Sequence, residues 1–330
     1  MTYRITQLYQ DLQWINQSPV ILAPSEHINT TSPYLVKTPF RNKPITWKQE
    51  ELEVLQFTLQ KKQNYRLGHY YETLVHVLLQ SHPEVSFLKH NIPVHASGRT
   101  LGEFDLLYVD QTVNHWIHRE LAVKFYLGLP SQSTQKISAW HQWVGPNCQD
   151  RLDIKVNKML TKQLRLSEYP EAKSILNQLT LATGNTIQGK EPIKEGVLQG
   201  YLFYPFKQHC PPPVNANTHH LNGDWVTESE LTDYLTSLTE SYQIKGQLVY
   251  IPLTKLEWLS PVHRPVINEV KGFMSNIALQ KSMQERFALA QPPQLIAACY
   301  QDRHFFNEVR RFFVVADHWP DKAVAATQET

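Results

Sequence analysis

Two stretches decide which fold this sequence predicts: Gly102-Glu103-Phe104-Asp105-Leu106-Leu107 and His118-Arg119-Glu120-Leu121-Ala122-Val123-Lys124. Both have the apolar content of buried strands, and the short polar connection between them predicts an antiparallel hairpin. Side chains alternate between the two faces of a strand, so Glu120 and Lys124 share a face of the second strand. Charged groups inside an apolar strand need a partner or a metal, because burying them unpaired is costly.

Asp105 on the first strand and Glu120 on the second predict a carboxylate pair across the hairpin. Two carboxylates with a lysine nearby suit a divalent cation and a phosphodiester, since Mg²⁺ takes a few carboxylate oxygens and keeps several waters. Such a cation activates a water molecule, and Lys124 would stabilise the developing negative charge. His118 shares the face of Glu120, where we expect a hydrogen-bonded strand histidine more than an additional ligand.

The flanking sequence predicts further helices and strands. Leucines at three- and four-residue steps predict a helix over residues 46–63, and a second apolar stripe predicts one over residues 67–79. Gly145-Pro146-Asn147 leads into a predicted helix over residues 150–166, and a capping box at residues 227–230 opens another. The predicted strands cover residues 87–94, 103–109, 116–126, 198–206, 247–252, 294–300 and 311–317.

One predicted helix carries an acid, one strand carries Asp, and the next strand carries Glu and Lys. Together these predicted elements resemble the PD-(D/E)XK superfamily. The matching segments are Leu67-Gly68-His69-Tyr70-Tyr71-Glu72, Gly102-Glu103-Phe104-Asp105, Glu120-Leu121-Ala122-Val123-Lys124-Phe125-Tyr126-Leu127, and Gly145-Pro146-Asn147 with Asp150 and Lys155. More narrowly, the chain resembles an uncharacterised bacterial domain-of-unknown-function family of that superfamily. That resemblance includes Gly200-Tyr201-Leu202-Phe203-Tyr204-Pro205 and Trp258-Leu259-Ser260-Pro261.

The resemblance implies an α/β fold with a restriction-endonuclease-like core. Its central mixed β-sheet would be flanked by helices and followed by a mixed α/β C-terminal extension. It also implies a metal-dependent nuclease with Mg²⁺ as cofactor, in which Asp105 and Glu120 are the metal ligands. Lys124 would be the catalytic lysine, and Glu72 would assist as the acid of the first helix.

One position departs from the superfamily pattern, which places an acid two residues before the lysine. Ala122 occupies that position, and Glu120 is four residues before Lys124. Four residues of extended strand separate the Cα atoms by roughly 13 Å. The side chains can still converge over the small Ala122, especially in a bulged strand. The alternative is a site that has lost its metal.

The sequence predicts three segments. Residues 1–60 form an N-terminal helical and irregular wrap, residues 61–185 form the core, and residues 186–330 form a C-terminal α/β region. The strands of the last segment could also continue the core sheet.

A basic stripe follows the loop at residues 145–147. Its members recur at four, three, four and three residues, which places them on one face of an α-helix; they are Arg151, Lys155, Lys158, Lys162 and Arg165. The stripe predicts either an ordinary solvated face or a nucleic-acid-binding surface beside the active site.

Composition sets the remaining bounds. The chain has 330 residues, 42% of them hydrophobic, and a formal net charge of only +2. This permits nucleic-acid binding without requiring it. Three dispersed cysteines predict a reducing compartment, and the N-terminus lacks an apolar signal region. We therefore expect a cytoplasmic protein with nucleic acid as its partner and no membrane association.

Three functional hypotheses stay open at this stage. The first is an Mg²⁺-dependent nuclease acting on DNA or RNA. The second is a catalytically inactive nuclease fold that acts as a nucleic-acid-binding or scaffold protein, and the third is a purely structural partner protein. The sequence contains no phosphate-binding P-loop, dinucleotide fingerprint, zinc-protease motif or serine-hydrolase motif that would favour another enzyme class.

Overall fold

The protein is an α/β protein with a mixed β-sheet, here in a computed structural model that describes residues 5–23, 34–35, 47–61, 66–131, 135–182, 187, 191–242, 248–266 and 272–328. The chain forms two compact units. Unit 1 comprises Met1–Lys124, Ile154–Gly200 and Asn215–His220. Unit 2 comprises Phe125–Asp153, Tyr201–Val214 and Leu221–Thr330. Within the described residues, no helix is long and apolar enough to cross a membrane.

The two units do not follow the three segments predicted from sequence, because two strands run through both. Strands β4 (His115–Gly128) and β6 (Ile193–Pro205) each begin in unit 1 and end in unit 2. They are neighbours in the sheet, so β6 joins the strands of the predicted core. The predicted boundary at residues 185/186 lies outside the described residues.

Unit 1 contains the predicted hairpin. Strands β2 (Val85–Ala96), β3 (Arg99–Asp110) and β4 pair antiparallel in that order, and β1 (Tyr34–Leu35) pairs parallel with β6. The antiparallel pairing of β3 with β4 is confirmed.

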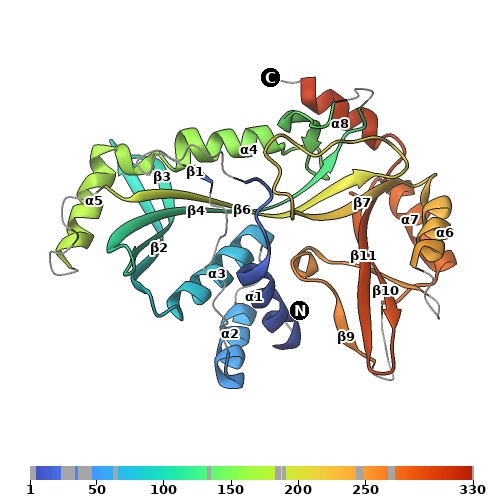
Figure 1. The fold of residues 1–330 in the computed structure, drawn as a ribbon, viewed down its shortest axis with the longest axis horizontal. Coiled ribbons are helices and arrows are strands. Elements are labelled where there is room, and N and C mark those ends of the chain that lie inside the picture. Colours follow the sequence, from blue (N-terminus) through green and yellow to red (C-terminus); the bar gives the residue numbers. More distant parts are fainter. Residues whose placement is uncertain are drawn as a thin grey trace. The chain divides into compact units, whose positions relative to one another are not determined.

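Helices cover both faces of this sheet. Helices α1 (Ile5–Gln17), α2 (Gln49–Lys61) and α3 (Leu67–Gln80) lie on one side, and α4 (Leu152–Lys158) and α5 (Pro170–Leu181) lie on the other (Figure 1). One face of the hairpin packs under α5, where the buried apolar residues are Val94, Phe104, Leu107, Val109, Trp116, Leu166, Ala172, Leu176 and Ile187. Strand β4 is buried on both faces along most of its length, as its apolar sequence predicts, whereas β2 and the start of β3 are partly exposed.

Buried hydrogen bonds hold α1 and α3 on their side of the sheet. The Tyr70 hydroxyl donates to Asp11 Oδ2 over 2.7 Å, and the Tyr71 hydroxyl donates to Gln199 Oε1 over 2.6 Å. Gln199 Nε2 in turn donates to the backbone carbonyls of Ile15 and Ser18. Satisfied buried polar groups of this kind fix one arrangement of the elements, because leaving any of them unpaired is costly.

Glycine is required where β6 approaches β4. Gly200 has φ of +136°, and a Cβ atom there would lie 1.7 Å from the backbone oxygen of Lys124. A side chain would therefore meet both an unfavourable backbone conformation and a hard steric clash. This close approach lies at the end of unit 1, where β4 leaves the candidate site described below.

The predicted long helix over residues 150–166 is present over residues 152–163, but its second half is not α-helical. Helix α4 ends at Lys158 and is followed by the π-helical turn η2 (Met159–Gln163) and the short 3-10 turn η3 (Leu166–Glu168). The amide of Leu164 donates to the carbonyl of Met159, five residues earlier. The Thr161 hydroxyl donates to the carbonyl of Asn157 over 2.7 Å and so competes for an acceptor of the α-helical ladder.

Unit 2 contains the second half of the sheet. The end of β6 pairs parallel with β7 (Leu221–Thr227), which pairs parallel with β11 (Phe305–Val315). Strand β10 (Gln294–Gln301) lies antiparallel between β11 and β8 (Val249–Pro252). The smaller elements are η1 (Trp140–Gln142), β5 (Trp143–Val144), η4 (Lys255–Glu257) and β9 (His263–Pro265).

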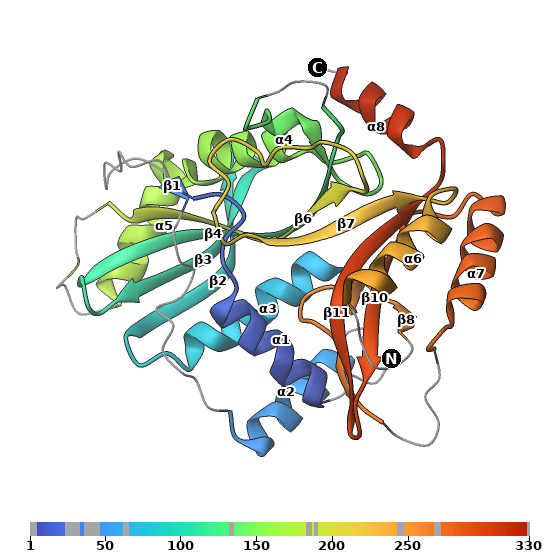
Figure 2. The same ribbon diagram turned by 45° about the vertical axis from the view of Figure 1, so that its right-hand side comes forward.

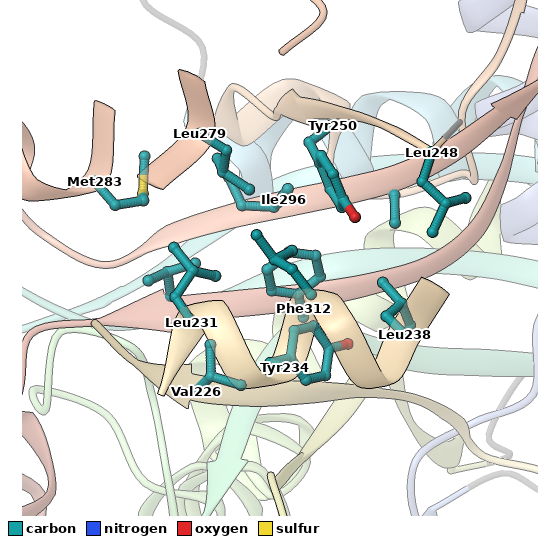
Figure 3. Close-up of a cluster of buried hydrophobic side chains, with 13 residues drawn as sticks. Val226, Leu231, Tyr234, Leu238, Leu248, Tyr250, Leu279, Met283, Ile296 and Phe312 are labelled. Carbon is teal, nitrogen blue, oxygen red and sulfur yellow. The ribbon is translucent and has the colours of Figure 1, made fainter. Parts of the chain in front are cut away.

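The core of unit 2 lies under two helices. Helices α6 (Leu231–Tyr242) and α7 (Asn276–Ala288) cover the same face of β10 and β11 (Figure 2). Figure 3 shows Leu231 and Tyr234 of α6, Leu279 and Met283 of α7, and Phe312 of β11 meeting in one buried cluster. This cluster gives unit 2 an apolar core of its own.

Sequence analysis missed several elements. One half of the predicted capping box is present, because Glu230 accepts hydrogen bonds from the backbone amide and hydroxyl of Thr227 just before α6. Strand β7 was missed because Asn222, Gly223 and Asp224 have low strand propensity. Helices α5, α7 and α8 (Trp319–Gln328) were also not predicted.

Candidate metal centre and its surroundings

The predicted site lies where β3 and β4 separate. Their described pairing runs from Asp110↔His115 to Leu106↔Arg119, which places Asp105 opposite Glu120 just beyond the last pair. Asp105 Oδ2 accepts a hydrogen bond of 2.8 Å from the backbone amide of Leu121. The Asp105 carboxylate thus accepts the hydrogen bond that a backbone carbonyl of β3 would accept if the β3–β4 pairing continued. The fork between the strands brings Asp105 and Glu120 together.

The Asp105 and Glu120 carboxyl groups are in hydrogen-bond contact with each other. Burial raises the pKa of Asp105 to about 7, and the negative charge of Glu120 raises it further against the hydrogen bond from Leu121. Burial likewise raises the pKa of Glu120 to about 7, with its hydrogen bonds to Asp105 opposing that shift. Two carboxyl groups placed this closely need a shared proton or a cation.

Neutral donors hold Glu120, whose side chain is fully buried. His118 Nε2 lies 2.9 Å from Glu120 Oε1, and Gln163 Nε2 donates to Glu120 Oε2 over 2.7 Å. Burial lowers the pKa of His118 to about 3, so the imidazole is neutral, and it donates to a charged Glu120 in the tautomer with the proton on Nε2. His118 Nδ1 is buried with no hydrogen-bond partner among the described residues, and the ring packs edge-on against Phe104. His118 therefore orients Glu120, a contact that strand alternation alone could not establish.

Lys155 points toward the carboxylates and not along an exposed stripe. Its Nζ donates to Gln163 Oε1 over 3.1 Å, so Gln163 connects Lys155 to Glu120. Burial lowers the pKa of Lys155, the positive charge of Lys124 lowers it further, and the charges of Asp105 and Glu120 oppose the shift. Lys155 is thus a half-buried cation within the electrostatic field of the carboxylate pair.

The π-helical turn explains how Lys155 and Gln163 meet. In a regular α-helix with 3.6 residues per turn, residues eight apart are about 80° apart around the axis. Hydrogen bonding to the fifth residue widens the turn to about 4.4 residues, which removes most of that offset across Met159–Gln163. Gln163 was missed by sequence analysis because an eight-residue spacing does not indicate a shared helical face.

Glu72 approaches the same carboxylates from α3. Burial raises the pKa of Glu72 to about 7, and the charges of Asp105 and Glu103 raise it further against that of Lys155. His69 Nδ1 lies 3.7 Å from Glu72 Oε2. Together with Asp105, Glu72 lines a cavity of about 670 Å³ in unit 1. The predicted first-helix acid is therefore brought next to the predicted strand acid.

The other predicted basic residues are placed differently. Lys124 is half-buried on β4, and its charge acts on Lys155. Lys158, Lys162 and Arg165 are exposed, whereas Arg151 is buried in unit 2. There it pairs with Asp153 and donates to the backbone carbonyl of Ala326. The predicted single stripe is wrong, because it begins at a residue outside α4 and crosses the π-helical turn.

The donor set suits a cation with a small number of protein ligands. Within the described part of the chain, no group of three or more His, Cys, Asp and Glu side chains is arranged to hold a metal ion. Asp105 and Glu120 provide two carboxylates, which is the number that Mg²⁺ commonly takes from a protein before water and substrate oxygens complete its shell. These two carboxyl groups are in contact and both have raised pKa values, so the site lacks positive charge. A bound cation would supply that charge.

The fold and the site define an α/β protein in which a fork between paired strands of a mixed sheet gathers buried carboxyl groups and a lysine. The chain belongs to the family described as Domain of unknown function (DUF1853), whose model matches residues 10–315. No curated protein and no solved structure matches the chain. Membership in a domain-of-unknown-function family, predicted from the segments around the two strands, is confirmed.

Proposed function

We propose that this protein is a divalent-metal-dependent phosphodiesterase acting on nucleic acid, built on a restriction-endonuclease-like core of the PD-(D/E)XK type. One observation carries the proposal: acids from three elements and a lysine from a fourth converge at one fork. The acids are Glu72 of α3, Asp105 of β3 and Glu120 of β4, and the lysine is Lys155 of α4. Carboxyl groups with shifted pKa values in such a cluster are typical of catalytic centres.

In this proposal Asp105 and Glu120 hold the metal ion, and His118 and Gln163 fix the orientation of Glu120. The bound cation supplies a water molecule of lowered pKa and offsets the charge of the phosphodiester. Water adds to phosphorus as the bond from phosphorus to the leaving oxygen breaks. Glu72, whose pKa is raised to about 7, would accept the proton that the water loses.

Lys155 takes the role that the resemblance implied for Lys124. Its ammonium group is connected through Gln163 to Glu120, and its pKa responds to both Asp105 and Glu120. A half-buried cation at this position would stabilise the negative charge that develops on the phosphoryl oxygens. The lysine then reaches the site from a helix. If Glu120 is the acid of the motif, the motif lysine would be expected two residues later, and a lysine from the helix would account for Ala122 at that position of β4.

A second candidate function rests on the two neutral donors to Glu120. Because His118 and Gln163 already satisfy both oxygens of Glu120, the fold could bind nucleic acid or act as a scaffold without cleaving it. The exposed Lys158 and Lys162 would then supply salt-dependent contacts to phosphates. In that case binding would survive the loss of Asp105.

Cleavage assays separate these functions. Wild-type protein should cleave at least one of single-stranded, duplex and structured DNA or RNA in magnesium or manganese, and not in EDTA. Asp105→Asn should lose activity by about 10²-fold or more, because the metal site loses a charged ligand. Asp110→Asn is a matched control, since that carboxylate lies at the turn of the same strand and accepts hydrogen bonds from Thr112. No divalent-dependent cleavage, or equal cleavage by Asp105→Asn, would contradict the proposal.

The two lysines provide a second test. Lys155→Met should lose about 10²-fold or more in kcat, whereas Lys124→Met should lose less than tenfold. The measurement is steady-state cleavage of the best substrate found for the wild type. If Lys124→Met were the more damaging change, the assignment made from the resemblance alone would be restored.

A further inference from the structure

The cavity beside the carboxylates has the size of a ligand site. Its volume of about 670 Å³ falls within the roughly 300–1,000 Å³ of small-molecule pockets. It lies within unit 1, between α2, α3 and the strands β2 and β3, and reaches Asp105 and Glu72. Buried Leu106 and Leu121 form its apolar floor. Any group that enters this cavity lies directly against the candidate metal centre.

The charge of the wall excludes phosphate as its occupant. Among the described residues that line the cavity, none is lysine or arginine, whereas Glu50, Glu51, Glu72 and Asp105 are acidic. A phosphate group inside would be repelled by the acidic side chains and would find no lysine or arginine among the described lining residues to pair with. The lysines of α4 and η2 are not among the lining residues. A neutral group is therefore favoured in the cavity.

The ring systems and amides of the wall favour a planar heterocycle. The imidazoles of His76 and His90 lie with ring centroids 4.0 Å apart. Burial and the neighbouring His90 lower the pKa of His76 to about 4, so His76 is neutral. The indole of Trp47 adds a stacking surface.

Asn91 adds a hydrogen-bonding group opposite the candidate metal ligand. It lies between the pairs His90↔Leu106 and Ile92↔Phe104, which places it across from Asp105. Its φ of 50° is in the left-handed region, so the backbone of β2 departs from regular strand geometry where the cavity meets the site.

We propose that this cavity receives the base of an unpaired nucleotide whose phosphodiester lies at Asp105 and Glu120. The inference rests on the proposed function and names its substrate class: single-stranded, bulged or mismatched nucleic acid in place of continuous duplex. A paired base cannot enter a pocket of this kind without leaving its stack, and that cost is smallest for a base that is already unpaired.

Filling the cavity tests this inference separately from cleavage. Thr58 of α2 lines the cavity, so Thr58→Trp should narrow it with an indole, whereas Phe57→Trp adds one at the adjacent exposed position, which is not among the described lining residues. Val54→Trp is a second filling variant, in case Thr58→Trp does not fold. The probes are DNA and RNA oligonucleotides with one 2-aminopurine, as single strand, bulge or full duplex, bound in EDTA so that no cleavage occurs. Their 2-aminopurine emission reports whether the base has left its stack.

The inference predicts at least tenfold tighter binding of the single-stranded and bulged probes than of the duplex, with a change in 2-aminopurine emission. Thr58→Trp should weaken binding at least tenfold and remove the emission change, and Phe57→Trp should leave both intact. If the wild type cleaves duplex and single strand equally and Thr58→Trp cleaves like wild type, the inference fails while the proposed function stands. If the filling variant loses the emission change but the wild type cleaves nothing, the nucleotide site stands and the proposed function fails.

Discussion

Two charge clusters, one in each unit, bury their charges in opposite ways. In unit 2, Arg311 and Glu308 form a two-point ion pair with nitrogen–oxygen distances of 2.6 and 3.0 Å. Arg311 also donates to the backbone carbonyls of Trp258, Leu259 and Ser260. In unit 1, three acids gather around Lys155, and each has its pKa raised to about 7. Charges in the Arg311 cluster of unit 2 are matched for stability, whereas acids in the Lys155 cluster of unit 1 are left in excess.

This difference indicates what each cluster is for. A buried ion pair with all of its hydrogen bonds made needs nothing more from its surroundings. A cluster of carboxyl groups with raised pKa values carries a free-energy cost in the charged state, and a bound cation would remove that cost. The excess of acids in unit 1 is therefore the physical argument for a metal-binding function.

The largest expected effect on stability comes from breaking the matched pair. Glu308→Ala leaves the buried guanidinium of Arg311 without its carboxylate and removes the acceptor for the amide of Val262. We expect a loss of about 3–5 kcal/mol in the free energy of unfolding. Chemical denaturation measures it, and a loss below about 1 kcal/mol would show that the pair is not needed for stability.

Removing a neutral donor from Glu120 should cost less and should depend on pH. Gln163→Leu leaves one oxygen of Glu120 and the ammonium of Lys155 without their shared partner. We expect a loss of about 1–3 kcal/mol near pH 8, where Glu120 is charged, and a smaller loss near pH 5.5, where it holds a proton. Lys162→Leu is the matched control, because that neighbouring side chain is exposed. Equal losses for both variants at both pH values would contradict this role of Gln163.

Asp105→Asn should not destabilise the metal-free protein near pH 8. It removes one of two charges in contact and keeps an oxygen that can accept from the amide of Leu121. We expect a gain on the order of 1 kcal/mol in the free energy of unfolding. The measurement is denaturation in EDTA beside wild type. A loss similar to that of Glu308→Ala would mean that Asp105 is a structural group like those of unit 2.

The stability of the folded protein should depend on pH because of the same three acids. The pKa values of Glu72, Asp105 and Glu120 are raised above ordinary values of 3.8 to 4.5, so the folded state holds more protons than the unfolded state between about pH 4 and pH 7. Their contribution to stability is present below the ordinary values and is lost as the pH rises through about 7. We therefore expect magnesium to raise the Tm by a few degrees near pH 8 and by much less near pH 5.5. Equal shifts at the two pH values would contradict this.

Much of the fold could be predicted from local patterns. Alternation in β3 and β4 indicated the hairpin and the shared face of His118 and Glu120, and the leucine spacing indicated α2 and α3. The predicted restriction-endonuclease-like arrangement as a whole stays a proposal. The parallel pairing of β6 with β7 and of β7 with β11 joins segments distant in sequence, which no local pattern specifies.

The acids of the candidate site could be predicted from the sequence, whereas the role of its lysine could be predicted only in part. Glu72, Asp105 and Glu120 each carry a signal, because each is an acid on an apolar helix or strand. Lys155 was placed on an exposed stripe, since α-helical periodicity contains no sign that a π-helical turn follows. The cavity depends on the packing of α2 against α3 and β2, so its lining residues have no common sequence signature.

Titration of metal into the protein tests the central claim most directly. Isothermal titration calorimetry with manganese near pH 8 should show one binding event for wild type and for Asp110→Asn. The same titration should show no binding, or binding at least 100-fold weaker, for Asp105→Asn, because the cation loses one of its two carboxylate ligands. Wild type without a binding event, or Asp105→Asn with wild-type affinity, would contradict the account.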